Sequence, residues 1–482
     1  MSELSTGFKL MRRALNTGSV RALIRYCIKK CERCGRRPID TYLDELLGMK
    51  IEKCLECRIA LSILRFVTGV TVKPEKWKGP GNSSIKDVIS KSYWRKGVVS
   101  LLKGILYFGP RKPFVTGAPL LVVWNFTNRC NLACQHCYQD AKPSGLSNEL
   151  TTEEALKIVN EFAEAEVTSI SFSGGEPLLR RDIYDVAKRA KDLGMYVSIA
   201  TNGTMLTKET AQKLSEAVHY VEISLDGVTP YIHDGFRGVS GAWEKAIQGI
   251  RNSVEAGLYT TIATTATKIN LAEIPEIVRF TEEVGAKGFL CFNFIPTGRA
   301  FDAKNIDLSP TERENLLKFL YEKLVDFTIN GGPNIFVTAP QFSRVGIQHS
   351  KTLKEKFASQ CRNSALIPTT HYGNLPDVTT EVAGYIGGCG AGRVYCGLNP
   401  DGVLIPCVFM PIPLGNLRRE RFEDLWVNSP ILNDLRNRDK LVGRCGRCGY
   451  RYICGGCRAR AYGYAGNYLY PDPGCIRSLE EA

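Results

Sequence analysis

The sequence predicts an α/β fold in which about six strand–helix units form a parallel sheet between two cysteine-rich, metal-binding modules. Three observations support this prediction. Strand-like apolar runs alternate with helix-like segments through the middle of the chain, which is typical of a parallel sheet. The 18 cysteines of the 482 residues gather in clusters. The excess of basic residues lies in the first quarter. Four regions follow, at residues 1–115, 116–330, 331–385 and 386–482.

The overall composition is that of a globular protein. With 44% hydrophobic and 23% charged residues, the chain is neither disordered nor fibrous. No apolar run reaches the roughly 18 residues of a membrane-spanning helix. The first 20 residues lack the apolar core and cleavage site of a signal peptide. We therefore expect a cytoplasmic protein in a reducing compartment, where clustered cysteines indicate metal ligands before disulfides.

The first region is strongly basic. Residues 1–115 hold 24 Lys and Arg against 9 Asp and Glu, a charge of +15, while the remainder holds 39 against 40. Such a segment attracts polyanions, either an anionic membrane surface or nucleic acid, unless it is merely a solvated basic surface. Apolar spacing predicts one amphipathic helix over residues 85–108. This helix either lies in a membrane interface, which makes the protein peripheral at the membrane, or packs on the sheet as ordinary core.

Two Cys-x2-Cys pairs in the first region predict a metal site. Cys31 and Cys34 are separated by 19 residues from Cys54 and Cys57. This spacing fits a four-thiolate zinc or rubredoxin-like iron site, with a further iron–sulfur cluster or free thiols as alternatives. Cys27 lies three residues before Cys31, but no strand precedes it and no glycine-rich turn follows.

Residues 116–330 contain the strand–helix units. The strands are expected at residues 120–126, 167–172, 196–200, 221–225, 260–264 and 288–294. The helices are expected at residues 152–163, 182–193, 208–217, 242–256, 271–284 and 310–327. Such units in series form an open barrel or a doubly wound sheet, and in both folds ligands bind at the carboxyl ends of the strands.

A cysteine triplet follows the first strand directly. Cys130, Cys134 and Cys137 have the spacing Cys-x3-Cys-x2-Cys. Three thiolates close in sequence can hold three corners of a [4Fe–4S] cluster. Because no fourth cysteine lies nearby, one iron would remain open to an outside ligand, as in catalytic metal sites.

The triplet resembles the signature of the radical SAM superfamily, in which S-adenosylmethionine (SAM) chelates the open iron. His136 stands where that family usually has an aromatic residue. Residues 173–177 (Ser-Gly-Gly-Glu-Pro), 201–203 and 224–227 end the second, third and fourth strands, like the family's segments around SAM. Residues 233–238 are similar to a segment common in the peptide- and tetrapyrrole-modifying branch of that family, and residues 293–299 end the sixth strand and are expected to complete the pocket. The resemblance implies SAM contacts from Gly174, Gly175, Glu176, Asn202 and Ser224.

The last region holds eight cysteines with little regular pattern. Eight thiolates equal two sets of four, which suits two [4Fe–4S] clusters or two zinc sites. The arrangement resembles the SPASM domain that follows many radical SAM cores. That resemblance implies one auxiliary cluster on Cys389, Cys396, Cys407 and Cys457, and another on Cys445, Cys448, Cys454 and Cys475. Cys291 and Cys361 remain unassigned.

Together these observations predict a partial (β/α)6 barrel with cysteine-rich modules at both ends, carrying three [4Fe–4S] clusters, SAM, and one zinc or iron at the N-terminal site. The expected activity is cleavage of SAM and modification of a substrate C–H bond, with electrons from a ferredoxin- or flavodoxin-type donor. The substrate is a peptide or protein side chain or a tetrapyrrole, and a membrane lipid is an alternative. A non-catalytic iron–sulfur electron-transfer or nucleic-acid-binding protein is the alternative from another class. The catalytic residues are not predicted.

Overall fold

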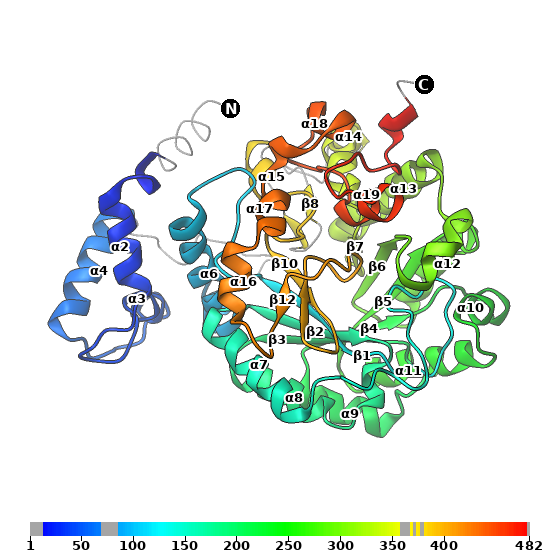
Figure 1. Ribbon diagram of the computed structural model, residues 1–482, viewed down its shortest axis with the longest axis horizontal. Helices are drawn as coiled ribbons and strands as arrows, with labels where there is room; N and C mark the ends of the chain where they lie inside the picture. Colours follow the sequence, from blue (N-terminus) through cyan, green and yellow to red (C-terminus); the bar gives the residue numbers. More distant parts are fainter. Residues whose placement is uncertain (1–12, 69–84, 357–366, 370–372, 376–379, 480–482) are drawn as a thin grey trace.

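A ten-stranded sheet organises the molecule. The computed structural model describes residues 13–68, 85–356, 367–369, 373–375 and 380–479. The strand order is β12-β11-β10-β1-β2-β3-β4-β5-β6-β7, and Figure 1 shows the sheet curving around a central space. The strands from β10 through β1 to β7 run parallel, and β11 and β12 are antiparallel additions. Their bounds are β1 Leu121–Thr127, β2 Ser169–Gly174, β3 Tyr196–Thr201, β4 Tyr220–Ser224, β5 Tyr259–Ala266, β6 Gly288–Asn293, β7 Asn334–Val337, β10 Tyr395–Leu398, β11 Val403–Ile405 and β12 Gly415–Asn416.

The six predicted strands are confirmed as β1 to β6, and the parallel partial barrel is confirmed with them. Two further parallel strands lie outside the region expected to form the sheet. β7 comes from residues 331–385 and pairs with β6. β10 comes from the last region and pairs with β1, with Leu121 opposite Tyr395. Both strands have four residues, too few to show a periodicity, so the sequence pattern did not reveal them.

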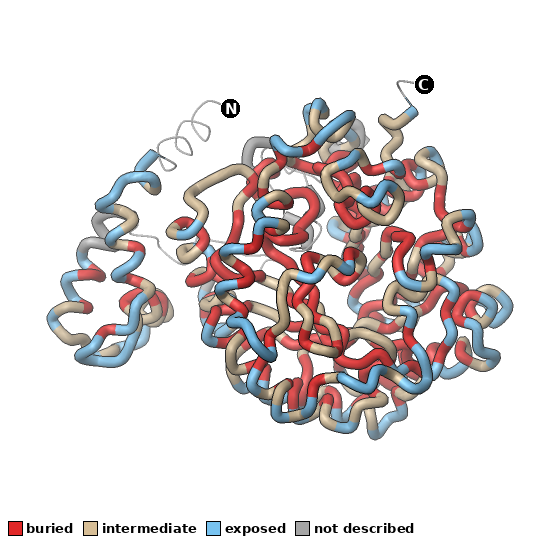
Figure 2. Tube along the Cα trace, in the orientation of Figure 1, coloured by how far each residue is buried: buried red, intermediate tan, exposed pale blue. Residues whose placement is uncertain are grey.

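Helices cover the outer face of the sheet and leave its inner face to a cavity. Their bounds are α7 Thr152–Ala165, α8 Ile183–Asp192, α9 Lys208–Ala217, α10 Pro230–Arg237, α11 Ala242–Glu255, α12 Ile274–Glu283 and α13 Pro310–Asn330. Thr151 begins α7 with a capping box that it forms with Glu154. Between helices and sheet lies the main core, where Trp124 stacks on Phe172 at 5.7 Å between ring centroids. Figure 2 shows this buried layer continuing around the barrel.

The last region folds onto one end of the barrel. Its helices, and those that lead to it, are α14 Gln341–Lys356, α15 Thr380–Ile386, α16 Phe422–Asn428, α17 Pro430–Arg436, α18 Gly443–Arg447 and α19 Arg458–Ala465, with a hairpin of β8 Ile367–Thr369 and β9 Gly373–Leu375. A buried ion pair ties it to the barrel, because Arg460 on α19 pairs with Asp307 at 2.8 Å. Arg460 also pairs with Asp472 of the last region at 3.2 Å.

The first region forms a small helical module beside the barrel, with α2 Gly18–Ile28, α3 Pro38–Leu46 and α4 Leu55–Thr68. The helix predicted at residues 85–108 is interrupted at Lys91 and forms α5 Ile85–Ser90 and α6 Ser92–Phe108. α6 packs between the module and the barrel. Val99 is fully buried beside Cys27 and Ile39, and a Cβ on Gly104 would lie 2.2 Å from the carbonyl oxygen of Val115.

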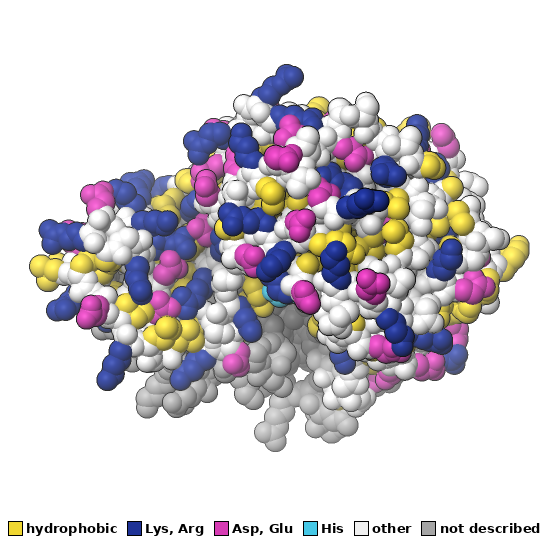
Figure 3. Space-filling view, turned by 90° about the horizontal axis from the view of Figure 1, so that it is seen from below, with side chains coloured by type: hydrophobic (Ala, Val, Ile, Leu, Met, Phe, Trp, Pro, Cys, Tyr) yellow, Lys and Arg dark blue, Asp and Glu magenta, His cyan; other side chains and the backbone are white. Residues whose placement is uncertain are grey.

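Most of the apolar face of α6 is therefore ordinary core, although Leu101 is exposed, and the interpretation of this helix as a membrane-interface element is not supported. Its cations are also engaged by protein. Lys96 donates to the carbonyl of Ala163 at 2.9 Å, and Lys103 pairs with Glu423 at 3.3 Å. Within the described residues, no helix combines the length and hydropathy needed to span a bilayer. Figure 3 shows basic side chains over the N-terminal module, at the left of the view.

Candidate functional site

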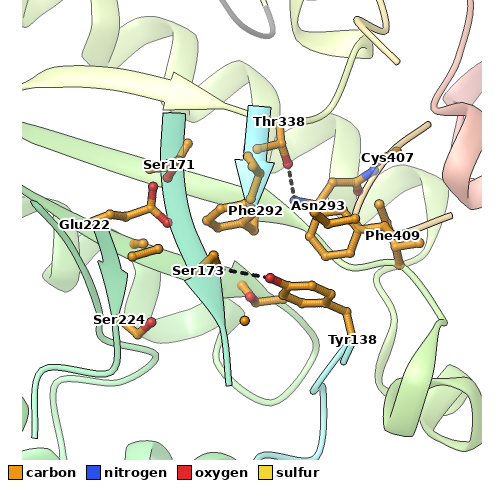
Figure 4. Close-up of a pocket in the computed structure, with 18 of the residues that line it drawn as sticks. Tyr138, Ser171, Ser173, Glu222, Ser224, Phe292, Asn293, Thr338, Cys407 and Phe409 are labelled. Atoms are coloured by element: carbon orange, nitrogen blue, oxygen red, sulfur yellow. Dashed lines mark hydrogen bonds between the residues drawn. The ribbon is translucent and has the colours of Figure 1, made fainter. Parts of the chain in front are cut away.

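A cavity of about 680 Å³ lies inside the barrel and extends along the strands to their carboxyl ends. Its walls come from three parts of the chain: the inner faces of β1 to β7, the cysteine loop after β1, and three segments of the last region around Cys389, Cys407 and Cys457. Figure 4 shows Phe409 of the last region close to Tyr138 of the cysteine loop, and their ring centroids are 4.8 Å apart. The barrel and the last region thus enclose one shared space.

The cysteine loop brings Cys130, Cys134 and Cys137 to this cavity. The loop backbone supplies donors to the sulfurs: the N–H of Leu132 donates to Cys130 Sγ and the N–H of Ala141 donates to Cys137 Sγ, each at 3.4 Å. Burial raises the pKa of Cys130 to about 12. Thiolates here therefore need a cation, and the donor set suits a metal cluster held by three thiolates.

Two arginines hold the cysteine loop in place. Arg237 Nε donates to Asp226 Oδ2 at 2.7 Å, and its Nη1 lies 3.7 Å from Cys134 Sγ. Arg299 donates from Nη1 to the carbonyl of Cys134 at 2.8 Å and from Nη2 to the carbonyl of Ala141 at 2.6 Å. The sequence analysis singled out the segments 233–238 and 293–299, which contain these arginines, but it did not predict that the two arginines fix the cysteine loop.

The two residues that flank Cys137 have defined contacts. His136 stacks on Phe236 at 4.1 Å between centroids and 7° between planes, so it takes the place of an aromatic ring. Burial lowers the pKa of His136 well below its ordinary value. The hydroxyl of Tyr138 bonds with Ser173 Oγ at 3.0 Å, as Figure 4 shows, and donates to Asn125 Oδ1 at 2.9 Å. Sequence reasoning missed Tyr138, whose only signal was its position after the third cysteine.

The glycine pair at the end of β2 lies directly against the cysteine loop. Gly174 has φ +122°, a conformation that favours glycine. The N–H of Gly175 donates to the carbonyl of Thr127 at 2.8 Å, and a Cβ on Gly175 would lie 2.1 Å from the carbonyl oxygen of Arg129. Both glycines line the cavity together with Asn202 and Ser224. Four of the five residues expected to contact SAM therefore share one rim.

Glu176, the fifth of them, is not among the residues that line the cavity. Its carboxylate is fully buried and accepts from Thr201 Oγ1 at 2.8 Å, from the N–H of Asn202 at 2.8 Å and from the N–H of Leu178 at 3.1 Å. Burial raises the pKa of Glu176 to about 7 although these donors oppose the shift. Glu176 thus joins the ends of β2 and β3 and positions the rim from behind.

Three of the four cysteines expected to hold the first auxiliary cluster line the same cavity: Cys389, Cys407 and Cys457. Cys396 does not join them. It follows Tyr395 on β10, and Tyr395 lines the cavity, so strand alternation turns Cys396 to the opposite face. There it is fully buried in the main core. Cys396 as a ligand stays a prediction, which this orientation does not favour and which residue spacing alone could not judge.

The four cysteines expected to hold the second auxiliary cluster surround a second cavity, of about 420 Å³. Basic side chains lie at this site. Arg477 Nη1 donates to Cys448 Sγ at 3.2 Å, and Arg458 Nη2 lies 3.7 Å from Cys445 Sγ. The N–H of Gly456 donates to Cys454 Sγ at 3.3 Å. Such donors suit a group with anionic thiolates. The cysteines are Cys445, Cys448, Cys454 and Cys475.

The four cysteines of the N-terminal pairs also converge, and their sulfurs lie closer together than those of the cysteines around the second cavity. The sulfurs of Cys31, Cys34, Cys54 and Cys57 all lie within 4.8 Å of one another. The pairs Cys31–Cys54 and Cys34–Cys57 are each 3.5 Å apart. A tetrahedral ion with metal–sulfur bonds of about 2.3 Å holds its sulfurs about 3.8 Å apart. A cubane cluster places four irons between its thiolates, so this set fits a single ion.

The remaining cysteines lie apart from these sets. Cys27 is buried beside Ile39 and Val99, and burial raises its pKa to about 11. Cys291 on β6 is buried as well, and burial raises its pKa to about 12. Both behave as small apolar core residues. Cys361 lies outside the described residues.

Comparison with known proteins agrees with this geometry. The radical SAM superfamily model matches residues 124–281, and a SPASM iron–sulfur cluster-binding domain matches residues 389–449. The AdoMet-dependent heme synthase of Methanosarcina barkeri is 35% identical over 366 residues, which are 75% of this chain and 97% of that protein. The chain belongs to the radical SAM superfamily. The family predicted from the cysteine triplet is thereby confirmed.

Other radical SAM proteins are similar as well. The mycofactocin maturase MftC of Mycobacterium tuberculosis is 29% identical over 373 residues, 76% of this chain and 84% of that protein. The crystal structure of Streptococcus suis SuiB bound to the precursor peptide SuiA has a TM-score of 0.59 at 19% identity and covers 90% of this chain and 91% of SuiB. At that identity the likeness concerns the fold. Radical SAM enzymes use [4Fe–4S] clusters and SAM, and the thiols and glycine rim described above fit both.

Proposed function

We propose that Cys130, Cys134 and Cys137 hold a [4Fe–4S] cluster and that SAM binds at the rim formed by Gly174, Gly175, Asn202 and Ser224. The observation that carries this proposal is the placement of three donor-supplied thiols beside a glycine edge at the mouth of one cavity. A reduced cluster held by these cysteines would supply one electron for cleavage of SAM to methionine and a 5′-deoxyadenosyl radical, which would take hydrogen from a substrate C–H bond. Arg237, Arg299 and Tyr138 fix the loop, and the barrel walls exclude water.

The proposed substrate is a peptide or protein side chain or a tetrapyrrole. The named relatives include a heme synthase and a mycofactocin maturase, which support these two classes. The cavity offers aromatic walls from Phe292, Phe336 and Phe409, which suit a planar ring or an apolar side chain. The lipid alternative loses its main support because the apolar face of α6 is covered by protein. The non-catalytic alternative offers no role for the glycine rim.

The auxiliary metal sites complete this proposal. Cys389, Cys407 and Cys457 would hold one cluster at the wall of the substrate cavity, and Cys445, Cys448, Cys454 and Cys475 would hold another beyond it. With one cluster at the cavity wall and the other beyond it, the two would suit transfer of electrons between the cavity and an external ferredoxin- or flavodoxin-type partner. The N-terminal set would hold one zinc or rubredoxin-like iron ion, which stabilises a module with few buried residues.

The test is reductive cleavage of SAM by the anaerobically reconstituted chain with dithionite. We expect 5′-deoxyadenosine and methionine from the wild-type protein. The triple variant C130A, C134A and C137A should yield neither, while it retains the iron of the last region. A triple variant that still forms 5′-deoxyadenosine would show that the cluster lies elsewhere. A wild-type protein that forms none would favour the non-catalytic alternative.

A further inference from the structure

One acidic side chain of the barrel cavity has no role in the site described above. β4 turns Tyr220, Glu222 and Ser224 into the cavity, whereas Val221 and Ile223 face the covering helices and are fully buried. Figure 4 shows Glu222 reaching from β4 toward the middle of the space. Ser224 lies at the rim, and Glu222 lies about 7 Å further from it along the strand. Glu222 thus lies deeper in the barrel than the proposed SAM site.

The cavity supplies no counter-charge for this carboxyl group. Among the described residues that line it, Glu222 has the one carboxyl group and Arg237 the one guanidinium. Arg237 is already bonded to Asp226. His136 is stacked on Phe236. No hydrogen bond or ion pair joins Glu222 to another described residue, and burial alone raises its pKa to about 7.

A carboxylate without a partner inside a protein is unfavourable, because burial removes the water that stabilises its charge. Such groups occur where a ligand completes the charge balance. The opposite wall indicates the shape of that ligand. Phe292 on β6 and Phe336 on β7 give this part of the cavity an apolar surface, and the hydroxyls of Ser171 and Ser198 lie on the neighbouring strands. The space suits an apolar stem that ends in a cation.

We propose that Glu222 binds a positively charged nitrogen of the substrate, an ammonium or guanidinium group, inside the barrel. The inference rests on the proposed radical SAM function and names the chemistry of its substrate. A guanidinium would form a charge-assisted pair with the carboxylate, while its stem would lie against Phe292 and Phe336. Of the two substrate classes, this favours a peptide with a Lys or Arg side chain. A tetrapyrrole with carboxylate side chains would bring negative charge toward the carboxylate of Glu222, which is unfavourable.

The test uses hexylguanidinium as a cationic ligand and hexanoate as its anionic counterpart. Binding of both is measured calorimetrically to the reconstituted, SAM-loaded protein. Hexylguanidinium should bind the wild-type protein, and its affinity should fall about tenfold in E222Q because a charge-assisted hydrogen bond is lost. E222D, which restores the charge, should recover part of that affinity. E164Q removes an exposed carboxylate on α7 and should leave binding unchanged. Hexanoate should bind the wild-type protein more weakly than hexylguanidinium does.

Two further measurements distinguish a substrate site at Glu222 from a role of Glu222 in SAM binding. The affinity for SAM and the yield of 5′-deoxyadenosine without added substrate should be the same in E222Q and wild type. If SAM affinity falls in E222Q, Glu222 belongs to the SAM site and the proposal is wrong. The proposal is also wrong if hexylguanidinium fails to bind or binds E222Q equally well. In both cases intact SAM cleavage by the wild-type protein would leave the proposed radical SAM function standing, whereas absent cleavage would contradict that function itself.

Discussion

The N-terminal and C-terminal cysteine regions share the Cys-x2-Cys spacing but differ in the geometry of their thiols. The four N-terminal sulfurs converge within 4.8 Å of one another. Cys445, Cys448, Cys454 and Cys475 instead surround a cavity of about 420 Å³. Spacing along the chain therefore indicates that metal binds, whereas the distance between sulfurs separates a single ion from a cluster.

The two regions also differ in what else holds them together. The C-terminal region contributes β10 to the main sheet and buries the ion pairs of Arg460. The N-terminal module contacts the barrel through α6 and through polar pairs such as Arg37 with Glu166. Figure 2 shows that much of this module is exposed. Its fold should therefore depend more on its metal than the fold of the C-terminal region does.

The largest expected effect comes from removing the ion proposed for the N-terminal site. In the double variant C31S and C54S, one metal equivalent should be lost, and residues 13–68 should become sensitive to limited proteolysis. The reason is that a structural four-thiolate ion contributes about 10 kcal/mol or more to the folding of a small module. Metal analysis and mass spectrometry of the fragments measure both effects, and SAM cleavage should persist.

Cys27 provides the matched control for that variant. It lies three residues from Cys31 but outside the four-sulfur group, so C27A should keep the ion. Equal metal loss in C27A, or an unchanged metal content in the double variant, would contradict the single-ion site.

The proposed cluster site in the barrel, unlike the two terminal cysteine regions, depends on close approach between the backbone at Gly175 and the cysteine loop. The variant G175A tests this approach. A Cβ at Gly175 would meet the carbonyl oxygen of Arg129 at 2.1 Å and displace the rim from the cysteine loop. A misplacement of about 1 Å costs about a hundredfold in rate, so 5′-deoxyadenosine formation should fall by that order. At Gly235 a Cβ meets nothing within 4 Å, and G235A should retain the wild-type rate. Similar rates in both variants would contradict the proposed rim.

A smaller effect, on iron content, should distinguish the substitution of Cys454 from that of Cys396, two buried cysteines of the last region. C454A should lose about four iron per chain because a ligand of the second auxiliary cluster is gone. C396A should lose none, since Cys396 faces the core on β10. Iron analysis after anaerobic reconstitution compares the two, and iron loss in C396A would restore Cys396 to the ligand set.

Most of the barrel could be predicted from the sequence because its strands and helices are long enough to show their periodicities. The strand positions also brought the cysteine triplet, the glycine pair and Asn202 to one rim. Short elements escaped prediction: β7 and β10 have four residues each. The direction of individual side chains could not be predicted either. Cys396 faces away from the cavity, and Glu176 lies behind the rim. The contacts of α6 required tertiary structure, because an amphipathic face does not reveal what covers it.

The metal inventory of the wild-type chain tests the central claim most directly, namely that three cysteine sets hold clusters and the N-terminal set holds a single ion. Iron and zinc are counted per chain after anaerobic reconstitution. The account expects about 12 iron, with one further zinc or iron ion. About four iron with several zinc ions would contradict it, because the C-terminal region would then be a zinc module with no part in electron transfer.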